Sequence, residues 1–212
     1  CRLETLVIKG NKVGYDGAKA IAEALCVNST LTSLNISNNS IGDEGISHLA
    51  KPLSKNRLKE LNISFNDITS TGVLALRDAF RQCTALETLL LDNNKICNEG
   101  ATGLMECIVH LDIKKLGLSF NTIETAGIKK ILLLLPPKLE SLNISDNRIT
   151  SNVVEELFDL LANNSCLREL NIDRHKIGEA GRIAIASGIA ANRTSALRKF
   201  TGFNLGPAMT QL

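Results

Sequence analysis

Apolar residues recur along this chain in one pattern that occurs seven times. Each copy reads close to LxxLxLxxNxI, followed in most copies by a glycine six residues after the asparagine and by apolar residues four and eight positions later. The first copy shows the pattern at Leu3, Leu6, Ile8, Asn11, Val13, Gly17, Ile21 and Leu25. Full copies begin at residues 3, 31, 58, 86, 113, 139 and 167, and a degenerate partial copy begins at residue 197.

Each copy contains two hydrophobic periods. Leu6 and Ile8 have the period of two that places side chains on one face of a strand. Ile21 and Leu25 have the spacing of one face of a helix. A single strand and helix cannot bury both apolar faces, whereas stacked copies can. The pattern therefore predicts one α/β solenoid domain over residues 1–212, with a parallel sheet on one side and helices on the other.

The LxxLxLxxNxI phrase resembles the leucine-rich repeat, and the helix-bearing half of each unit resembles the ribonuclease-inhibitor-like subclass. Ribonuclease inhibitors, the sensor regions of NOD-like receptors and Ran GTPase-activating proteins share that subclass. The resemblance covers residues 3 to about 196. It implies a horseshoe with the parallel sheet on the concave face and the helices on the convex face. It implies little about function, because one scaffold serves all of these roles.

A column of asparagines closes the strand phrase in the first six units: Asn11, Asn39, Asn66, Asn94, Asn121 and Asn147. The resemblance implies a ladder in which these side chains bond the backbone of neighbouring loops, and every turn needs such partners for its amide groups. The seventh unit has His175 instead. This histidine either substitutes in the ladder or marks a local distortion near the end of the array.

A column of glycines precedes the helical half of the units: Gly17, Gly45, Gly72, Gly100, Gly127 and Gly181. Glycine at this position fits either an unusual φ or a close approach of two chain segments. The sixth unit has Val153 there. Either the position does not need a positive φ, or the sixth helix begins differently.

The positions that vary between units are the candidates for contact with a partner. Because strand side chains alternate, we expect the fixed letters of LxxLxLxxN to point inward and the variable positions between them to face the concave surface. Phe65 and Phe120 are two repeats apart, about 10 Å, and could anchor a protein edge or simply pack over their neighbours. The predicted partner-binding residues are Asn35, Ser37, Asn62, Phe65, Leu90, Asp92, Gly117, Phe120, Asn143, Asp146 and Arg174.

Charges alternate in sign at the position after the opening leucine of consecutive units: Lys59, Glu87, Lys114, Glu140 and Arg168. We expect surface ion pairs between neighbouring repeats, each contributing about 0–1 kcal/mol. The alternation leaves this edge nearly neutral, so it is a poor surface for attracting a strongly charged partner.

Composition narrows the partner classes. Lys plus Arg is 24 and Asp plus Glu is 22, a net charge of +2, and only 3% of residues are aromatic, which argues against nucleic acid. The apolar run 131–135 stops at Pro136 and is too short to cross a membrane. The six cysteines have no CxxC spacing, which favours reduced thiols. We expect no nucleic acid, no membrane insertion, no metal and no cofactor.

No catalytic motif is present, and the three histidines occupy different positions of the unit, so they would not converge on a nucleophile. We predict a monomeric, cytoplasmic, non-catalytic scaffold that binds a protein through its concave face, with a nuclear location also compatible. The resemblance leaves two alternatives, a GTPase-activating protein of the Ran type and the sensor segment of a NOD-like receptor. A ribonuclease inhibitor fits less well, because that family is cysteine-rich and acidic.

The two ends of the array lack the caps that solenoids need. The first unit begins at once with Leu3, which leaves its core end bare and predicts flanking sequence before it. The last unit has Gly202 where an apolar residue belongs, with Pro207 soon after, and is interpreted as a partial cap.

Overall fold

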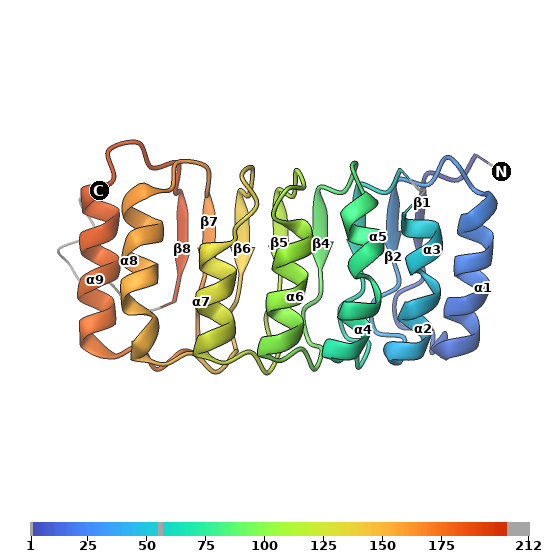
Figure 1. Ribbon diagram of the computed structural model, residues 1–212, viewed down its shortest axis with the longest axis horizontal. Coiled ribbons are helices and arrows are strands. Elements are labelled where there is room, and N and C mark those ends of the chain that lie inside the picture. The colour runs from blue at the N-terminus through green and yellow to red at the C-terminus, as the bar shows by residue number, and fades with distance from the viewer. Residues whose placement is uncertain (1, 55–56, 203–212) are drawn as a thin grey trace.

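Eight parallel strands follow one another in chain order in the computed structural model, and each pairs with the strands of the adjacent units (Figure 1). The structure describes residues 2–54 and 57–202. Every strand has three residues: β1 Thr5–Val7, β2 Ser33–Asn35, β3 Glu60–Asn62, β4 Thr88–Leu90, β5 Lys115–Gly117, β6 Ser141–Asn143, β7 Glu169–Asn171 and β8 Lys199–Thr201. The sheet thus grows by one strand per repeat, as predicted.

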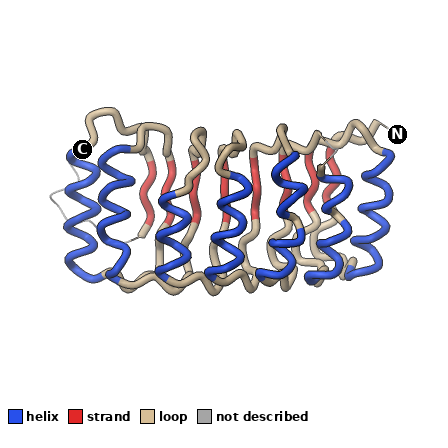
Figure 2. Tube along the Cα trace, in the orientation of Figure 1, coloured by secondary structure: helices blue, strands red, loops and turns tan. Residues whose placement is uncertain are grey.

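The helices form a single layer on one face of this sheet (Figure 2). Their bounds are α1 Gly14–Val27, α2 Gly42–His48, α3 Ala50–Leu53, α4 Ser70–Ala75, α5 Arg77–Gln82, α6 Asn98–Ile108, α7 Thr125–Leu133, α8 Val154–Asn163 and α9 Gly178–Ala191. Packed helices need about 8–10 Å between axes and strands only about 4.8 Å. The helical side is therefore the wider one, and the sheet lies on the concave side.

Register stacks equivalent residues of neighbouring units. Leu34 pairs with Leu6 on one side and Leu61 on the other, and the middle leucine of each strand from β2 to β7 is at most 1% exposed. Between sheet and helices the core is aliphatic, with Phe80 its largest fully buried side chain. Full burial of one such side chain contributes about 1.5–3 kcal/mol. The predicted stacking of units on a shared core is confirmed.

The asparagine column forms the expected ladder. Asn39 Nδ2 donates to the carbonyl oxygens of Ile36 in its own unit and Ile8 in the preceding unit, both at 2.9 Å. Its Oδ1 accepts the backbone N–H of Asn11 at 2.8 Å. Asn66 continues the series by accepting the N–H of Asn39 at 2.9 Å. From Asn39 to Asn147 each side chain therefore ties its own turn to the previous one and satisfies buried backbone groups.

Close packing explains the glycine column, since none of its members has a positive φ. At Gly100 an added Cβ would lie 2.6 Å from Ser70 Oγ and 2.8 Å from Ser70 Cα. In the sixth unit Val153 ends a 3-10 turn, η1 Ser151–Val153, that precedes α8. Both alternatives that the sequence left open therefore hold: the position does not need a positive φ, and the sixth helix begins differently.

The first unit leaves apolar side chains uncovered. A hollow of about 650 Å³ there is lined by residues that include Leu3, Leu6 and Ile21, and Leu3 is 42% exposed. In the last unit Phe200 packs against the core from β8. Pro207, part of the predicted partial cap, lies outside the described residues. Within residues 2–54 and 57–202, no helix combines the length and the apolar character needed to cross a membrane.

Candidate partner-binding surface

The surface of the sheet that faces away from the helices, called the open face below, consists of the first and third residues of each strand. The third residues, from β1 to β8, are Val7, Asn35, Asn62, Leu90, Gly117, Asn143, Asn171 and Thr201. All of them except Gly117 are at least partly exposed, whereas the middle residues of β2 to β7 are buried. The predicted residues Asn35, Asn62, Leu90 and Asn143 therefore do lie on the open face.

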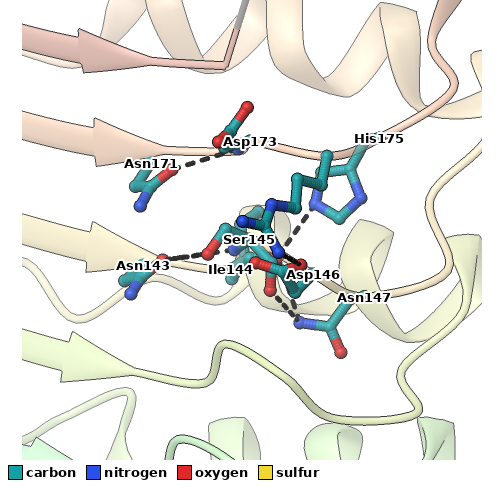
Figure 3. A network of polar contacts seen from close by, with 9 residues as sticks. Asn143, Ile144, Ser145, Asp146, Asn147, Asn171, Asp173 and His175 are labelled. Carbon is teal, nitrogen blue, oxygen red and sulfur yellow. Dashed lines mark hydrogen bonds and ion pairs between the residues drawn. The ribbon is translucent and has the colours of Figure 1, made fainter.

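Four asparagines in this row hold a fixed orientation. Asn35 Oδ1 accepts the N–H of Ser37 at 3.1 Å, and Asn62 does the same for Ser64 at 3.1 Å. Asn143 and Asn171 bind the N–H groups two residues further on, at 3.2 and 3.0 Å (Figure 3). A backbone N–H can only donate, so the oxygen must face the turn and the Nδ2 donors must face outward. These four Nδ2 groups have no acceptor within the described part of the chain.

Ser37 does not fit the prediction of direct partner contact. Its side chain is only 2% exposed, and its Oγ donates to Asn35 Oδ1 at 2.8 Å. The same position is also buried at Ser64, Ser119 and Ser145. The strands end one residue before the isoleucine or leucine that precedes this position, so strand alternation no longer decides which way its side chain points. Ser37 positions Asn35 from below the surface.

Asp92 and Gly117 act together rather than as two separate contacts. Asp92 Oδ1 accepts the N–H of Ser119 at 2.8 Å and is also bound by the Ser119 hydroxyl. A Cβ added at Gly117 would lie within 3 Å of the Asp92 carboxylate carbon. The carboxylate of one unit thus covers the glycine of the next, and Gly117 is buried, contrary to the expectation of an exposed position.

Residues directly before the ladder position have left-handed backbone conformations. Their φ angles are +75° at Gly10, +57° at Asn38, +56° at Phe65, +56° at Asn93, +50° at Phe120, +52° at Asp146 and +60° at Arg174. We call this set the turn row. The expectation that these residues belong to the strands is therefore wrong, because the strands have already ended. They lie in the turns that border the open face.

Phe65 and Phe120 are the two aromatic members of the turn row. They are 50% and 47% exposed. A left-handed conformation is common for glycine and tolerated by asparagine, but it is unfavourable for a bulky side chain. The repeat geometry imposes the left-handed conformation on this position of every unit, and phenylalanine is unfavourable in it. Two exposed phenylalanines in this conformation contribute little to folding.

Asp146 and Arg174 continue the turn row beyond Phe120. Arg174 Nη1 lies 3.2 Å from Asp146 Oδ1, and its guanidinium carbon lies 5.8 Å from the centre of the Phe120 ring. The Arg174 side chain is 67% exposed. The predicted residues Phe120, Asp146 and Arg174, which come from three consecutive units, therefore form one contiguous patch.

The charge ladder forms two of its possible pairs. Lys114 Nζ lies 2.7 Å from Glu87 Oε2, and Arg168 Nε lies 3.5 Å from Glu140 Oε2. The hydrogen bond and charge of Lys114 lower the pKa of Glu87, and Glu87 in turn raises the pKa of Lys114. All four side chains are well exposed, so these ion pairs are weak surface interactions.

His175 substitutes for asparagine in the ladder. Its Nε2 lies 2.9 Å from the carbonyl oxygen of Ile144, the acceptor that a ladder asparagine would use in the previous unit (Figure 3). Its Nδ1 is buried and has no partner in the described structure. Burial lowers the pKa of His175 below its ordinary value. A carbonyl oxygen only accepts, so Nε2 carries the proton of the neutral ring.

The described residues offer no metal site, since no group of three or more His, Cys, Asp or Glu side chains could hold an ion. Burial raises the pKa of the Cys83 thiol to about 11. The exposed Cys97 has its pKa lowered by a hydrogen bond with Ser70, whose Oγ lies 3.0 Å from its Sγ. A hydroxyl is no general base, so this contact does not make a nucleophile pair.

Two features of this surface escaped the reading of the sequence. One is the row of outward-facing Nδ2 donors. Its signal in the sequence is asparagine followed two positions later by serine or aspartate, at Asn35, Asn62, Asn143 and Asn171. The other is the left-handed turn row, which asparagine or glycine in several units does indicate. Strand alternation was extended three residues too far and hid the turn row.

Comparison with known proteins identifies the repeat. A Leucine Rich repeat family model matches residues 1–22, 27–50, 55–76 and 163–186, and a Leucine Rich Repeat model matches residues 138–160. The chain is 27% identical over 201 residues to ribonuclease inhibitor of Sus scrofa, covering 92% of this chain and 44% of that protein. It is 29% identical over 171 residues to NACHT, LRR and PYD domains-containing protein 13 of Homo sapiens, covering 78% of this chain and 16% of that protein. The chain spans less than half the length of both relatives.

Among solved structures, Leiomodin-1 Actin-Binding Site 2 (ABS2) is similar with a TM-score of 0.55 at 22% sequence identity. The match covers 62% of this chain and 78% of that one. At this identity the similarity concerns the fold alone. It agrees with the parallel, helix-backed sheet described above.

Proposed function

This chain is a leucine-rich-repeat protein with relatives of the ribonuclease-inhibitor type, and we propose that it is a non-catalytic scaffold that holds a protein partner against its concave, open face. The observation that carries the proposal is the pair Phe65 and Phe120. Both are about half exposed, and both occupy left-handed turns where phenylalanine is unfavourable. Aromatic side chains of this kind are typical anchors of protein interfaces.

The surroundings of these anchors favour a protein partner. The open face supplies outward amide donors at Asn35, Asn62 and Asn143, and the turn row adds the charged pair Asp146 and Arg174. Apolar anchors bordered by hydrogen-bonding and charged groups are the usual composition of such an interface. Leu90 adds an apolar contact on the sheet, whereas Ser37 and Gly117 lie below the surface and the Asp92 carboxylate covers Gly117.

The similarity to a NACHT, LRR and PYD domains-containing protein favours a second candidate, in which this array is the sensor segment of a larger receptor. That candidate retains the same binding surface and differs in what the binding controls. We place the protein in the cytoplasm, as supported by the exposed, unpaired thiols of Cys26, Cys97 and Cys166.

Capture followed by reconstitution tests the proposal. Proteins retained by the immobilised 212-residue chain would be identified, purified and titrated against wild type, the Phe65→Asn/Phe120→Asn double variant and a control, Val27→Asn. Val27 is 87% exposed at the end of α1, on the helical side. We expect the double variant to lose at least about tenfold in affinity, as typical of two anchor residues, while the control binds as wild type. Equal affinity of the double variant would contradict the proposal.

A measurement of turnover tests the non-catalytic part. Adding the chain to a GTP-loaded GTPase of the Ran type should leave the rate of GTP hydrolysis unchanged. An accelerated rate would replace the scaffold proposal with the GTPase-activating alternative.

A further inference from the structure

One pair of neighbouring strands is repeated on the open face. β2 and β3 read Ser-Leu-Asn and Glu-Leu-Asn, and β6 and β7 read the same. Register places Ser33 beside Glu60 and Asn35 beside Asn62. The second copy places Ser141 beside Glu169 and Asn143 beside Asn171. We call these four-residue groups site one and site two.

The two sites also share their hydrogen bonds. Ser33 Oγ donates to Glu60 Oε2 at 2.9 Å, and Ser141 Oγ donates to Glu169 Oε2 at 3.2 Å. Both glutamates are exposed, and their Oε1 atoms have no partner in the described structure. Each site therefore presents one carboxylate held by a serine and, one row away, two outward amide donors.

The repeat itself does not require this chemistry. β4 and β5 have Thr88, Leu90, Lys115 and Gly117 at the equivalent positions and form the same strands with the same register. The turn at each asparagine needs only an oxygen acceptor, which aspartate would also supply. Asparagine in place of aspartate adds the Nδ2 donor, which makes no hydrogen bond within the described structure.

The donors within a site can act on one acceptor. Adjacent strands are about 4.8 Å apart, so two Nδ2 groups on neighbouring strands can both reach an oxygen placed between them. A carbonyl oxygen of a polypeptide is such an acceptor. The carboxylate of the same site, two residues away along the strand, is about 7 Å from that oxygen. A lysine or arginine side chain is about as long as this distance, so a residue whose carbonyl group binds the Asn pair can reach the carboxylate with its side chain.

Equivalent positions of the two sites are four strands apart, about 19 Å. An extended polypeptide covers this distance in about six residues. We propose that the open face binds an extended segment of a partner protein that crosses the strands and carries two basic residues six positions apart. One basic side chain binds Glu60 and the other binds Glu169, and the Nδ2 groups of each Asn pair donate to a backbone carbonyl oxygen of the segment. This inference rests on the proposed function and adds the chemistry of the partner.

The two sites differ in their surroundings. Lys199 lies beside Glu169 in register, and Lys115 lies beside Ser141 on the other side. These four side chains line a shallow polar hollow of about 180 Å³ together with Asn143 and Asn171. The row around Glu60 has only Ser33 and Thr88 as neighbours. Site one is therefore the stronger cation site, because the two lysines compete for Glu169 and repel a second cation.

Fluorescence anisotropy with synthetic peptides tests the inference. The probe is a labelled Gly/Ser/Thr peptide with two arginines six positions apart, compared with the same peptide with arginines three apart and with one arginine. We expect the six-residue spacing to bind at least about tenfold more tightly than one arginine, because the second contact becomes intramolecular. Equal affinity at both spacings would indicate non-specific attraction and overturn the proposal.

Variants assign the contacts. Glu60→Gln and Glu169→Gln retain an acceptor for the serine hydroxyl and remove the charge. We expect each to reduce affinity for the six-spaced peptide, Glu60→Gln by more, about tenfold. Glu155→Gln, an exposed acid in the first turn of α8, is the control and should bind as wild type. Wild-type affinity of both site variants would contradict the proposal.

The Lys199→Gln variant tests whether site two binds a cationic or an anionic group. Removal of this charge beside Glu169 should strengthen binding of the two-arginine peptide about twofold to threefold. Weaker binding would show that site two holds an anionic group, and the inference would then be wrong. If no peptide binds while Phe65→Asn/Phe120→Asn still abolishes partner binding, this inference fails and the proposed scaffold function stands. If peptides bind as expected but the phenylalanine variant retains its partner, the aromatic anchors fail instead.

Discussion

The guanidinium carbon of Arg174 lies 5.8 Å from the centre of the Phe120 ring, although the two residues belong to units two repeats apart. Asp146, in the unit between them, holds the guanidinium through a 3.2 Å contact. All three occupy the same position of consecutive units, in the turns that border the open face. Phe120 is thus part of a cross-repeat patch.

A double-mutant cycle should detect this contact. We expect Phe120→Ala and Arg174→Ala to show a coupling of about 0.5 kcal/mol in the free energy of unfolding, the usual size of an exposed cation–π contact. Urea unfolding of wild type, the two single variants and the double variant measures it. Because Asp146 also holds Arg174, the cycle repeated in an Asp146→Ala background should give a smaller coupling. Strict additivity in both backgrounds would contradict the contact.

Phe65 should be a site where asparagine stabilises the fold more than alanine does. Its φ of +56° is tolerated by asparagine and disfavoured for alanine as for phenylalanine. Both substitutions remove the same ring, so the difference between their free energies of unfolding reports the backbone strain alone. We expect the free energy of unfolding of the Phe65→Asn variant to be about 1 kcal/mol higher than that of the Phe65→Ala variant. An alanine variant at least as stable as the asparagine variant would rule out backbone strain at this turn.

Loss of a central ladder asparagine should cost far more than loss of the first one. Asn66 is fully buried, bonds the backbone of two units and accepts the N–H of Asn39. Asn66→Ala leaves several buried groups unpaired, and we expect a loss of about 3 kcal/mol. Asn11 is exposed and donates only within its own turn. Asn11→Ala should cost under about 1 kcal/mol by the same chemical denaturation, and comparable losses would show that the ladder contributes little.

His175 should make stability fall as the solution becomes acidic. Burial lowers its folded-state pKa below the ordinary value of 6.5. Below that pH the unfolded chain takes up a proton that the folded chain does not, so the free energy of unfolding decreases as pH falls from 6.5 towards the folded pKa. Above pH 6.5 the ring is neutral in both states and contributes no pH dependence.

His175→Asn should remove that contribution. Asparagine restores an oxygen acceptor where Nδ1 has no partner, so we also expect higher stability at neutral pH, by about 1 kcal/mol. The measurement is the difference in unfolding free energy between variant and wild type at pH 7.5, 6.5 and 5.5. The difference should grow as pH falls, and a constant difference would show that His175 does not titrate on unfolding.

The candidate surface was predicted in part. Asn35, Asn62, Leu90 and Asn143 lie on the open face as strand alternation requires, because three residues of each unit do form a strand. Alternation failed at Ser37, which is buried, and at Phe65 and Phe120, which lie in turns. Sequence periodicity carries no mark of where a three-residue strand ends, so the second and third residues after it were assigned to the wrong geometry.

The sequence by itself determined the repeat, the parallel order of the strands and the aliphatic core, and its resemblance to the leucine-rich repeat implied the asparagine ladder. The first three follow from the spacing of residues within one unit, and stacking identical units leaves few other ways to bury the apolar residues. Only the tertiary structure decided which groups of different units meet, such as Asp92 over Gly117, Arg174 over Phe120 and Ser33 beside Glu60. Those contacts depend on register and on side-chain direction across a gap of about one strand spacing, and spacing along the chain encodes neither.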